Sequence, residues 1–237
     1  MPLGRAHGLV WIVLLVSGLV PLAASATAQV ITSGPRTCPG VALTFDLCPV
    51  RDPVGYDAAL VDYLMANRIP STFFISGRWA AKHKAQVKAL QAVPFFELGT
   101  HGDVHAHLPM HDEGDQRREI SRAVALMQTR FGVAAPLFRP PYGEYNDLTV
   151  QVVKALGLQF ILWDLVSGDP DPTLSAATMA DRVRRRLRPG SIIVMHANGK
   201  GKHTRELVQT ISETMLAQKQ LRPMTVSELL ACQTPQR

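Results

Sequence analysis

The sequence predicts a single α/β domain in which helices bury a mainly parallel β-sheet. Short apolar runs rich in β-branched and aromatic residues alternate with longer amphipathic runs, which is typical of successive strand and helix units. No stretch rich in Gly, Ser or Pro divides the chain, and no internal repeat is evident. This pattern fits a barrel or a doubly wound sheet equally well, because periodicity does not separate the two.

The expected strands are short and mostly bounded by Gly or Pro. They cover Val41–Phe45, Ser71–Ile75, Phe95–Gly99, Leu137–Phe138, Phe160–Trp163 and Ser191–Met195. The amphipathic runs predict helices over Asp57–Asn67, Trp79–Gln91, Glu113–Phe131, Asn146–Leu156, Ala176–Leu187 and Thr204–Gln218. Asn146 is a good N-cap, and Gly132, Gly157 and Gly190 each follow a helical run, as C-terminal capping glycines do.

Residues 1–28 have the features of a secretory signal peptide and are excluded from the predicted domain. Arg5 precedes the apolar stretch Leu9–Leu22, and Ala26-Thr27-Ala28 forms an Ala-x-Ala cleavage pattern. The apolar stretch is short, because a membrane span needs about 20 residues. Cleavage would leave residues 29–237 as an exported domain in the periplasm or the medium, without a stable membrane anchor. An uncleaved N-terminal anchor is the alternative.

The chain is basic, with a formal charge of +6 at pH 7 that falls to +5 once the signal peptide and its one arginine are removed. For an exported protein, this charge favours anionic envelope polymers over nucleic acid as partners, although an ordinary basic surface is equally compatible. Five arginines lie within Arg182–Arg188. We expect them on a solvated helix face, where cations near the helix C-terminus are favourable.

Three cysteines, at positions 38, 48 and 232, belong to the predicted exported domain, where disulfides can form. Cys38 and Cys48 flank the first strand, and at about 3.3 Å per residue they lie too far apart to be bridged. We therefore predict that Cys38 pairs with Cys232, and that Cys48 is a free thiol.

Chemically capable side chains follow the predicted strands one after another. Asp46 follows the first strand, His101 the third, Arg139 the fourth, Asp164 the fifth and His196 the sixth. In parallel α/β folds the C-terminal ends of the strands share one face, where ligands bind. The sequence therefore predicts that these segments converge on one site.

His101 and His105 are spaced i,i+4, so a helical turn there would place both imidazoles on one face, where they could share a metal. Neutral imidazole is the commonest ligand of zinc and similar ions. Asp46 is a candidate general base that activates water, and His196 is a candidate acid for a leaving amine. Arg139 near Asp46 would keep that carboxylate ionised and oriented.

Taken in order, these segments resemble the polysaccharide deacetylases that share the NodB homology domain, carbohydrate esterase family 4. Thr44-Phe45-Asp46 is similar to the motif Thr-Phe-Asp-Asp, and His101 with His105 to His-Ser/Thr-x-x-His. Arg139-Pro140-Pro141-Tyr142 resembles Arg-x-Pro-Tyr, Trp163–Asp169 loosely resembles Asp-x-x-Asp-Trp, and Val194-Met195-His196 resembles Leu-x-His. The resemblance covers about residues 38–232.

The resemblance implies a distorted (β/α) barrel and metal-assisted removal of an acyl group from a carbohydrate such as peptidoglycan or a chitin-like polymer. It implies that His101 and His105 bind a divalent metal, with zinc the first choice. Asp46 would then be the base and His196 the acid. Arg139 would orient Asp46, and the backbone amide of Tyr142 would stabilise the oxyanion.

The sequence departs from the family motifs at several positions. Leu47 stands where the family has a second aspartate, the third metal ligand, so Asp46, Asp103 or water would have to complete the coordination, with Cys48 as a soft alternative. In the fourth motif only Asp169 matches, because Val166 and Pro170 replace the first Asp and the Trp. Asp164 is a nearby substitute for supporting His196. Gly102 replaces the Ser or Thr after His101.

These departures leave two alternatives to a glycan deacetylase. The same fold could hydrolyse another C–N bond, in a small amide or formamide. A chain that lost its metal through Leu47 could instead bind glycan without turnover, although a binding module needs no such set of acid, base and histidine residues.

Overall fold

The computed structural model describes residues 29–50 and 55–232, together with Met1, so the predicted signal peptide lies outside the described residues apart from Met1. Within this part of the chain, a parallel sheet has the strand order β1-β6-β5-β4-β3-β2-β8-β7, and β9 pairs with the start of β2. The strands are β1 (Val30–Ile31), β2 (Gly40–Leu47), β3 (Ser71–Ile75), β4 (Phe96–Thr100), β5 (Leu137–Phe138), β6 (Gln159–Ile161), β7 (Leu165–Val166), β8 (Ile192–His196) and β9 (Arg222–Met224).

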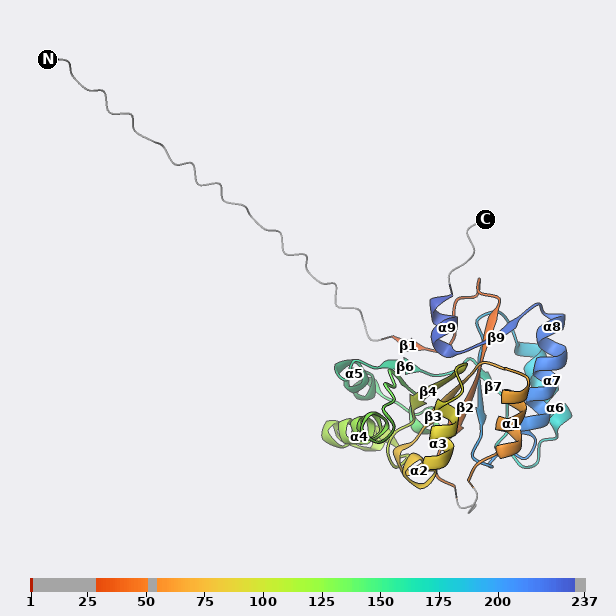
Figure 1. Cartoon of the computed structure of the whole chain (residues 1–237), viewed down its shortest axis with the longest axis horizontal. Coiled ribbons are helices and arrows are strands. Elements are labelled where there is room, and N and C mark those ends of the chain that lie inside the picture. The colour runs from red at the N-terminus through yellow and green to blue at the C-terminus, as the bar shows by residue number, and fades with distance from the viewer. Residues whose placement is uncertain (2–28, 51–54, 233–237) are drawn as a thin grey trace.

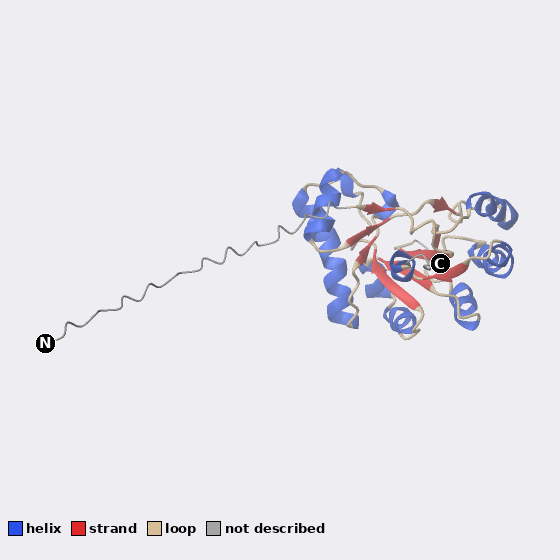
Figure 2. Cartoon of the chain, turned by 90° about the horizontal axis from the view of Figure 1, so that it is seen from above, coloured by secondary structure: helices blue, strands red, loops and turns tan. Residues whose placement is uncertain are grey.

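Helices lie around the outside of this sheet, as Figures 1 and 2 show. They are α1 (Ala58–Ala66), α2 (Gly77–Lys82), α3 (Lys84–Gln91), α4 (Glu113–Phe131), α5 (Asp147–Ala155), α6 (Ala176–Arg186), α7 (Thr204–Thr210), α8 (Leu216–Gln218) and α9 (Val226–Ala231). The strands from β2 to β6 are neighbours in sequence order and parallel, without the reversal of order that marks a doubly wound sheet, so the fold is a distorted (β/α) barrel. This confirms the barrel and excludes the doubly wound alternative.

The sheet separates two apolar layers. All eight residues of β2 are buried, and neighbouring side chains along the strand face opposite sides. Phe45 and Leu47 pack with the helices in the larger cluster, whereas Ala42 packs in a second cluster with Phe74 of β3. A strand buried on both faces is typical of a central parallel strand covered by helices. This arrangement fixes which β2 side chains can reach the functional site.

The predicted helices correspond to the observed ones, with two interruptions. The run Trp79–Gln91 breaks at His83, whose imidazole stacks on the Trp79 ring at 4.4 Å and contacts the Trp79 carbonyl oxygen through Nδ1. The run Thr204–Gln218 contains a π-helical turn over Ile211–Met215, where the Ser212 hydroxyl donates to the Val208 carbonyl. Such side-chain bonds to the preceding turn disturb helical geometry.

The termini of α4 and α5 follow the predicted capping chemistry. Gly132 ends α4 in the left-handed conformation, at φ 68°, which glycine adopts at little steric cost. Asn146 caps α5 by accepting a hydrogen bond from the Thr149 amide. The strands and α-helices that the sequence did not predict are β1, β7, β9 and α9. They have two to six residues each, too few for periodicity to register.

Two sequence expectations about the surface and the cysteines are confirmed. Arg184, Arg185, Arg186 and Arg188 are exposed near the C-terminal end of α6, as predicted for a solvated helix face, whereas Arg182 is half-buried. Cys38 is bonded to Cys232, and Cys48 is a buried free thiol. No helix in the described residues is long and apolar enough to cross a membrane.

Removing the disulfide should reduce stability strongly, because the bridge joins residues 194 positions apart and limits the unfolded chain. We expect Cys38→Ser with Cys232→Ser to lower the free energy of unfolding by about 2–5 kcal/mol, measured by urea denaturation. The matched control is Cys48→Ser, which leaves the bridge intact. Wild-type protein unfolded without reductant should expose one reactive thiol. Three would contradict the bridge.

Candidate active site

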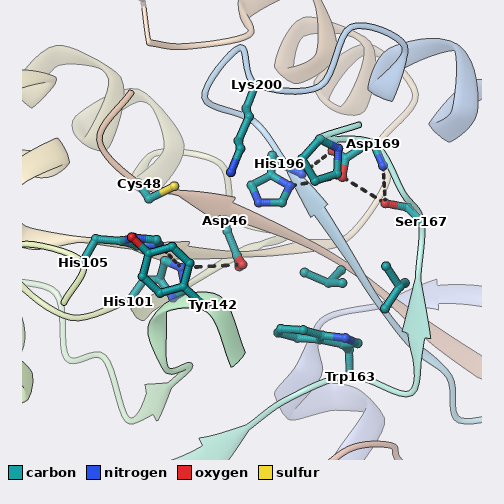
Figure 3. Close-up of a pocket in the computed structure, with 13 residues that line it drawn as sticks. Asp46, Cys48, His101, His105, Tyr142, Trp163, Ser167, Asp169, His196 and Lys200 are labelled. Carbon is teal, nitrogen blue, oxygen red and sulfur yellow. Dashed lines mark hydrogen bonds and ion pairs between the residues drawn. The ribbon is translucent and has the colours of Figure 1, made fainter. Parts of the chain in front are cut away.

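One pocket collects the side chains that follow the strands. It has a volume of about 180 Å³ and lies at the C-terminal ends of β2 and β8. Figure 3 shows Asp46 near its centre, with the histidines on two sides. The lining residues are Asp46, Cys48, His101, His105, Tyr142, Trp163, Val166, Ser167, Asp169, Pro170, Val194, His196 and Lys200. The predicted convergence therefore holds for Asp46, His101 and His196, and Arg139 joins them from behind the pocket.

Asp46 and Arg139 form a buried ion pair. Arg139 Nη1 donates to Asp46 Oδ1 at 2.9 Å, and the two side chains are 0% and 5% exposed. The guanidinium also lies over the Phe74 ring at 4.0 Å and donates to the Leu162 carbonyl. Burial alone would raise the pKa of Asp46, but the charge of Arg139, helped by His101 and His196, holds it below its usual 3.8. Asp46 is thus a carboxylate at neutral pH.

The His101 and His105 rings meet through their Nε2 atoms, which lie 3.2 Å apart. The segment does not form the helical turn that would place i and i+4 residues on one face. Residues 101–107 form a loop in which Gly102 and His105 both have φ of +69°. These left-handed residues turn the chain sharply enough for the two imidazoles to approach each other. The two imidazoles thus meet as the spacing suggested, but through a loop and not through a helical turn.

Both imidazoles are neutral, and His101 is held in the tautomer that can bind a metal through Nε2. His101 Nδ1 is 2.9 Å from the Arg139 carbonyl oxygen, so it is the donor nitrogen and Nε2 keeps its lone pair. Burial lowers the pKa of His101, and burial together with the neighbouring His101 lowers that of His105 to about 3. Two nitrogens bound tetrahedrally to zinc lie about 3.4 Å apart, close to the observed separation. The pair therefore fits a divalent ion.

The pair has no third protein ligand of the expected kind. Leu47 is fully buried in the helix-facing core and is absent from the pocket lining. Asp103, the substitute ligand considered from the sequence, lines a separate pocket with its Oδ1 towards Gly77, so that expectation is wrong. Within the described residues, no three His, Cys, Asp or Glu side chains form a metal-binding group.

Two further pocket residues differ in what they could offer a metal. Asp46 Oδ2 is 3.7 Å from His101 Nε2, which makes it the acidic oxygen beside the pair. Cys48 lines the pocket, but burial raises the pKa of its thiol to about 11, with the Asp46 charge adding to the effect. Coordination by Cys48 would have to release the thiol proton against this raised pKa, so oxygen atoms of Asp46, water or substrate are the more favourable ligands to complete the coordination.

His196 is oriented by Asp169. His196 Nδ1 lies 3.1 Å from Asp169 Oδ1, and the His196 backbone N–H donates to Asp169 Oδ2 at 2.7 Å. Asp169 is itself fixed by hydroxyl donors from Ser167 and Thr204, each at 3.0 Å. With Nδ1 engaged in this way, the ring presents its other nitrogen for proton transfer.

The expectation that Asp164 supports His196 is wrong. Asp164 accepts hydrogen bonds from the Ile192 backbone N–H and the Ser191 hydroxyl, and it pairs with Arg36 at 2.8 Å. It therefore lies at the start of β8, about 13 Å of strand away from His196 at the other end. The position of Asp164 directly after the fifth predicted strand suggested that it lies near the pocket. Instead, β7 begins beside Ile193 near the start of β8, so Asp164 lies at the end of β8 away from the pocket.

Tyr142, assigned from the family motif, lines the pocket, whereas Lys200 was not assigned from the sequence. Tyr142 is half-exposed, has φ of 61° and stacks on His107 with ring centroids 4.1 Å apart. Lys200 reaches the pocket from the loop after β8, as Figure 3 shows, and Trp163 forms part of its wall. The loop composition Asn-Gly-Lys-Gly indicated a turn but not a direction, so Lys200 could not have been found from spacing alone.

A parallel barrel with a polar pocket at the C-terminal ends of its strands is an arrangement typical of barrel enzymes, and comparison with known sequences identifies the family. Residues 33–161 match the family model described as polysaccharide deacetylase, and the chain belongs to that family.

Curated relatives include a bifunctional xylanase/xylan deacetylase of Cellvibrio japonicus, 31% identical over 182 residues, or 76% of this chain and 26% of that protein. A peptidoglycan-N-acetylglucosamine deacetylase of Bacillus cereus is 28% identical over 169 residues, 71% of this chain and 60% of that protein. The chain thus spans less than two thirds of the length of these two relatives.

Solved structures show the same fold. A peptidoglycan N-acetylglucosamine deacetylase superimposes with a TM-score of 0.77 at 25% identity, covering 86% of this chain and 94% of that one. A carbohydrate esterase family 4 pseudoenzyme from Bacillus anthracis gives a TM-score of 0.77 at 22% identity, covering 86% of this chain and 70% of that one. At that identity the second likeness concerns the fold alone.

Proposed function

We propose that the protein is an exported, metal-dependent deacetylase that removes acyl groups, N-acetyl groups foremost, from a carbohydrate polymer such as peptidoglycan or a chitin-like glycan. The main support for this proposal is that a candidate base and a candidate acid, each held by a partner side chain, share one pocket. Asp46 is held ionised by Arg139, and His196 is held in one orientation by Asp169. The neutral histidine pair lies beside Asp46 in the same pocket. The named activities of the family relatives agree with this chemistry.

His101 and His105 would hold the divalent metal, zinc being the ion that suits two imidazoles and oxygen ligands. When bound, the metal polarises the acyl carbonyl and the attacking water. Asp46 accepts a proton from that water, because its carboxylate stays ionised at neutral pH. His196 donates a proton to the leaving amine from Nε2, while Asp169 stabilises the charged ring. The Tyr142 backbone N–H would donate to the oxygen on which negative charge develops.

Acetate release from acetylated chito-oligosaccharides and from peptidoglycan tests this proposal. We expect turnover that a chelator abolishes and added Zn²⁺ restores. Metal-dependent activity on small amides or formamides alone would favour the alternative reaction. Leu47 favours a second candidate, a glycan-binding protein without turnover, because the position that would supply the third ligand is buried in the core. Binding to glycan with no metal and no acetate release would support that candidate over the hydrolase.

The two aspartates near β8 should differ sharply in their effect on catalysis. Asp169→Asn is expected to lower kcat at least about tenfold, because an amide stabilises the charged His196 ring less well than a carboxylate. Asp164→Asn should keep near-normal kcat, since Asp164 bonds to the start of β8 outside the pocket. The kcat values of the two variants are compared at saturating substrate. Equal losses of kcat would contradict the role of Asp169.

We also infer export, from the composition of residues 1–28. The first strand, β1, begins at Val30, so cleavage after Ala28 would leave every described element intact. N-terminal sequencing of the protein recovered from the periplasm or the medium should begin at Gln29. Recovery of uncleaved protein in the membrane fraction would instead support an N-terminal anchor.

A further inference from the structure

The loop that carries His105 is held from behind by one carboxylate. Glu119 Oε1 accepts hydrogen bonds from three consecutive backbone N–H groups, those of Val104, His105 and Ala106, at 2.9, 2.9 and 3.1 Å. Glu119 belongs to α4 and is 9% exposed. A buried carboxylate needs such donors, and bonds from N–H groups to an ionised acceptor are stronger than neutral ones. Glu119 therefore ties α4 to the histidine loop.

The opposite side of the same loop is tied to the start of α2. The Gly102 and Asp103 carbonyls accept hydrogen bonds from the Gly77 and Arg78 backbone N–H groups at 2.9 and 2.8 Å. His101 is fixed separately, because its backbone N–H donates to the Ile75 carbonyl and its ring to the Arg139 carbonyl. The position of His105, in contrast, follows from the backbone of residues 104–106. Glu119 is the side chain that bonds to all three of their N–H groups.

Gly102 leaves the space that this carboxylate occupies. A Cβ atom at position 102 would lie 2.7 Å from Glu119 Oε1, and the backbone there has φ of +69°. The Gly102 departure from the family motif is therefore compatible with the close approach of Glu119. His105 itself has φ of +69°, which is uncommon for a residue other than glycine and persists only where neighbouring contacts determine it.

We propose that Glu119 is a positioning residue of the active site, which holds His105 in the left-handed conformation that brings its Nε2 atom to His101. Its consequence for metal binding rests on the proposed function, whereas its effect on the loop does not. Without the carboxylate the three N–H groups lose their common acceptor, and His105 is released to other backbone conformations. The histidine pair then loses the preorganisation that favours a shared ion.

Two substitutions of similar size separate the acceptor from packing. Glu119→Met removes the acceptor, whereas Glu119→Gln keeps an oxygen that can accept the same N–H groups. In the metal-free protein, we expect Glu119→Met to speed hydrogen exchange of amides 104–106 at least tenfold relative to Glu119→Gln. Outer-shell partners typically change metal affinity about 10–100-fold, so Zn²⁺ affinity should fall by that factor in Glu119→Met and only a few-fold in Glu119→Gln. Absorption of the Co²⁺-loaded protein reports the same change in geometry.

The matched control is Glu113→Gln, an exposed position on the same helix that should leave both measurements unchanged. Equal exchange and equal Zn²⁺ affinity in the Met and Gln variants would overturn the proposal. Unprotected amides 104–106 in the wild-type protein would also overturn it, even if Glu119→Met failed to fold. Wild-type protein that binds Zn²⁺ but releases no acetate would contradict the proposed function and leave the role of Glu119 intact.

Discussion

The Asp46→Asn variant is expected to retain its fold and lose kcat for acetate release by about 10²–10⁴-fold, the range typical of a positioned proton-transfer group. Asparagine fills nearly the same space in the pocket but cannot accept a proton from water. Its side-chain oxygen can still accept a hydrogen bond from Arg139 Nη1, which lies 2.9 Å from Asp46 Oδ1 in the wild-type protein. The loss should therefore fall on kcat, with KM changed much less.

Steady-state kinetics with chito-oligosaccharide, together with metal analysis, distinguish a base from a ligand. If Asp46 acts as the base alone, the variant binds Zn²⁺ at wild-type stoichiometry while turnover is lost. If its oxygen completes the coordination beside His101, Zn²⁺ affinity falls with kcat. Asp181→Asn, on the surface of α6, is the control and should be indistinguishable from wild type. Full activity of Asp46→Asn would contradict the proposed chemistry.

The second large effect is expected from Arg139→Met. This change leaves the Asp46 carboxylate buried without its cation, and breaking a buried ion pair in this way destabilises a protein by about 3–5 kcal/mol. The double variant with Asp46→Asn should be more stable than the two single changes predict when added. Urea unfolding of the four proteins gives this coupling energy, and strict additivity would contradict the ion pair.

The same substitution should change the response to pH. In the wild-type protein the Asp46 pKa is lower in the folded than in the unfolded state, so the pair contributes stability above about pH 4. That contribution is lost as the pH falls through the folded-state pKa. Removing Arg139 leaves burial, which raises the pKa of Asp46, as the main influence. The acidic limb of the kcat profile should therefore move to higher pH in Arg139→Met.

The long strands and helices could be predicted from the sequence, because each of them has its own hydrophobic periodicity. Helix α4 spans Glu113–Phe131 as predicted, since an amphipathic run, an acidic N-cap and Gly132 all agree. β2 and β8 read as continuous apolar runs because both faces are buried. Whether the sheet closes towards a barrel depends on the curvature and pairing of strands far apart in the chain, which no local pattern contains.

The site residues also fall into two groups: those whose place follows from local sequence, and those whose place depends on residues far away in the chain. Asp46 and His196 end strands and could be placed by position, whereas Asp164 and Asp169 differ by five positions and lie at opposite ends of β8. The histidine pair was identified from its spacing, but its geometry depends on two left-handed residues and on Glu119, which belongs to another helix. Contacts between residues far apart in the chain leave no periodic pattern in the sequence.

The alternation along β2 determines how this site could be re-engineered. Asp46 and Cys48 are directed into the pocket, and Phe45 and Leu47 into the core beneath the helices. In the present packing, an aspartate at position 47 would start among the apolar side chains that surround Leu47, and it would have to turn out of them to reach the histidines. A designer who wants a third ligand would gain it more readily at Cys48, whose Cβ already lies on the pocket side. Supplying a ligand at position 47 would therefore require a change in how the end of β2 packs, as well as a change of residue type.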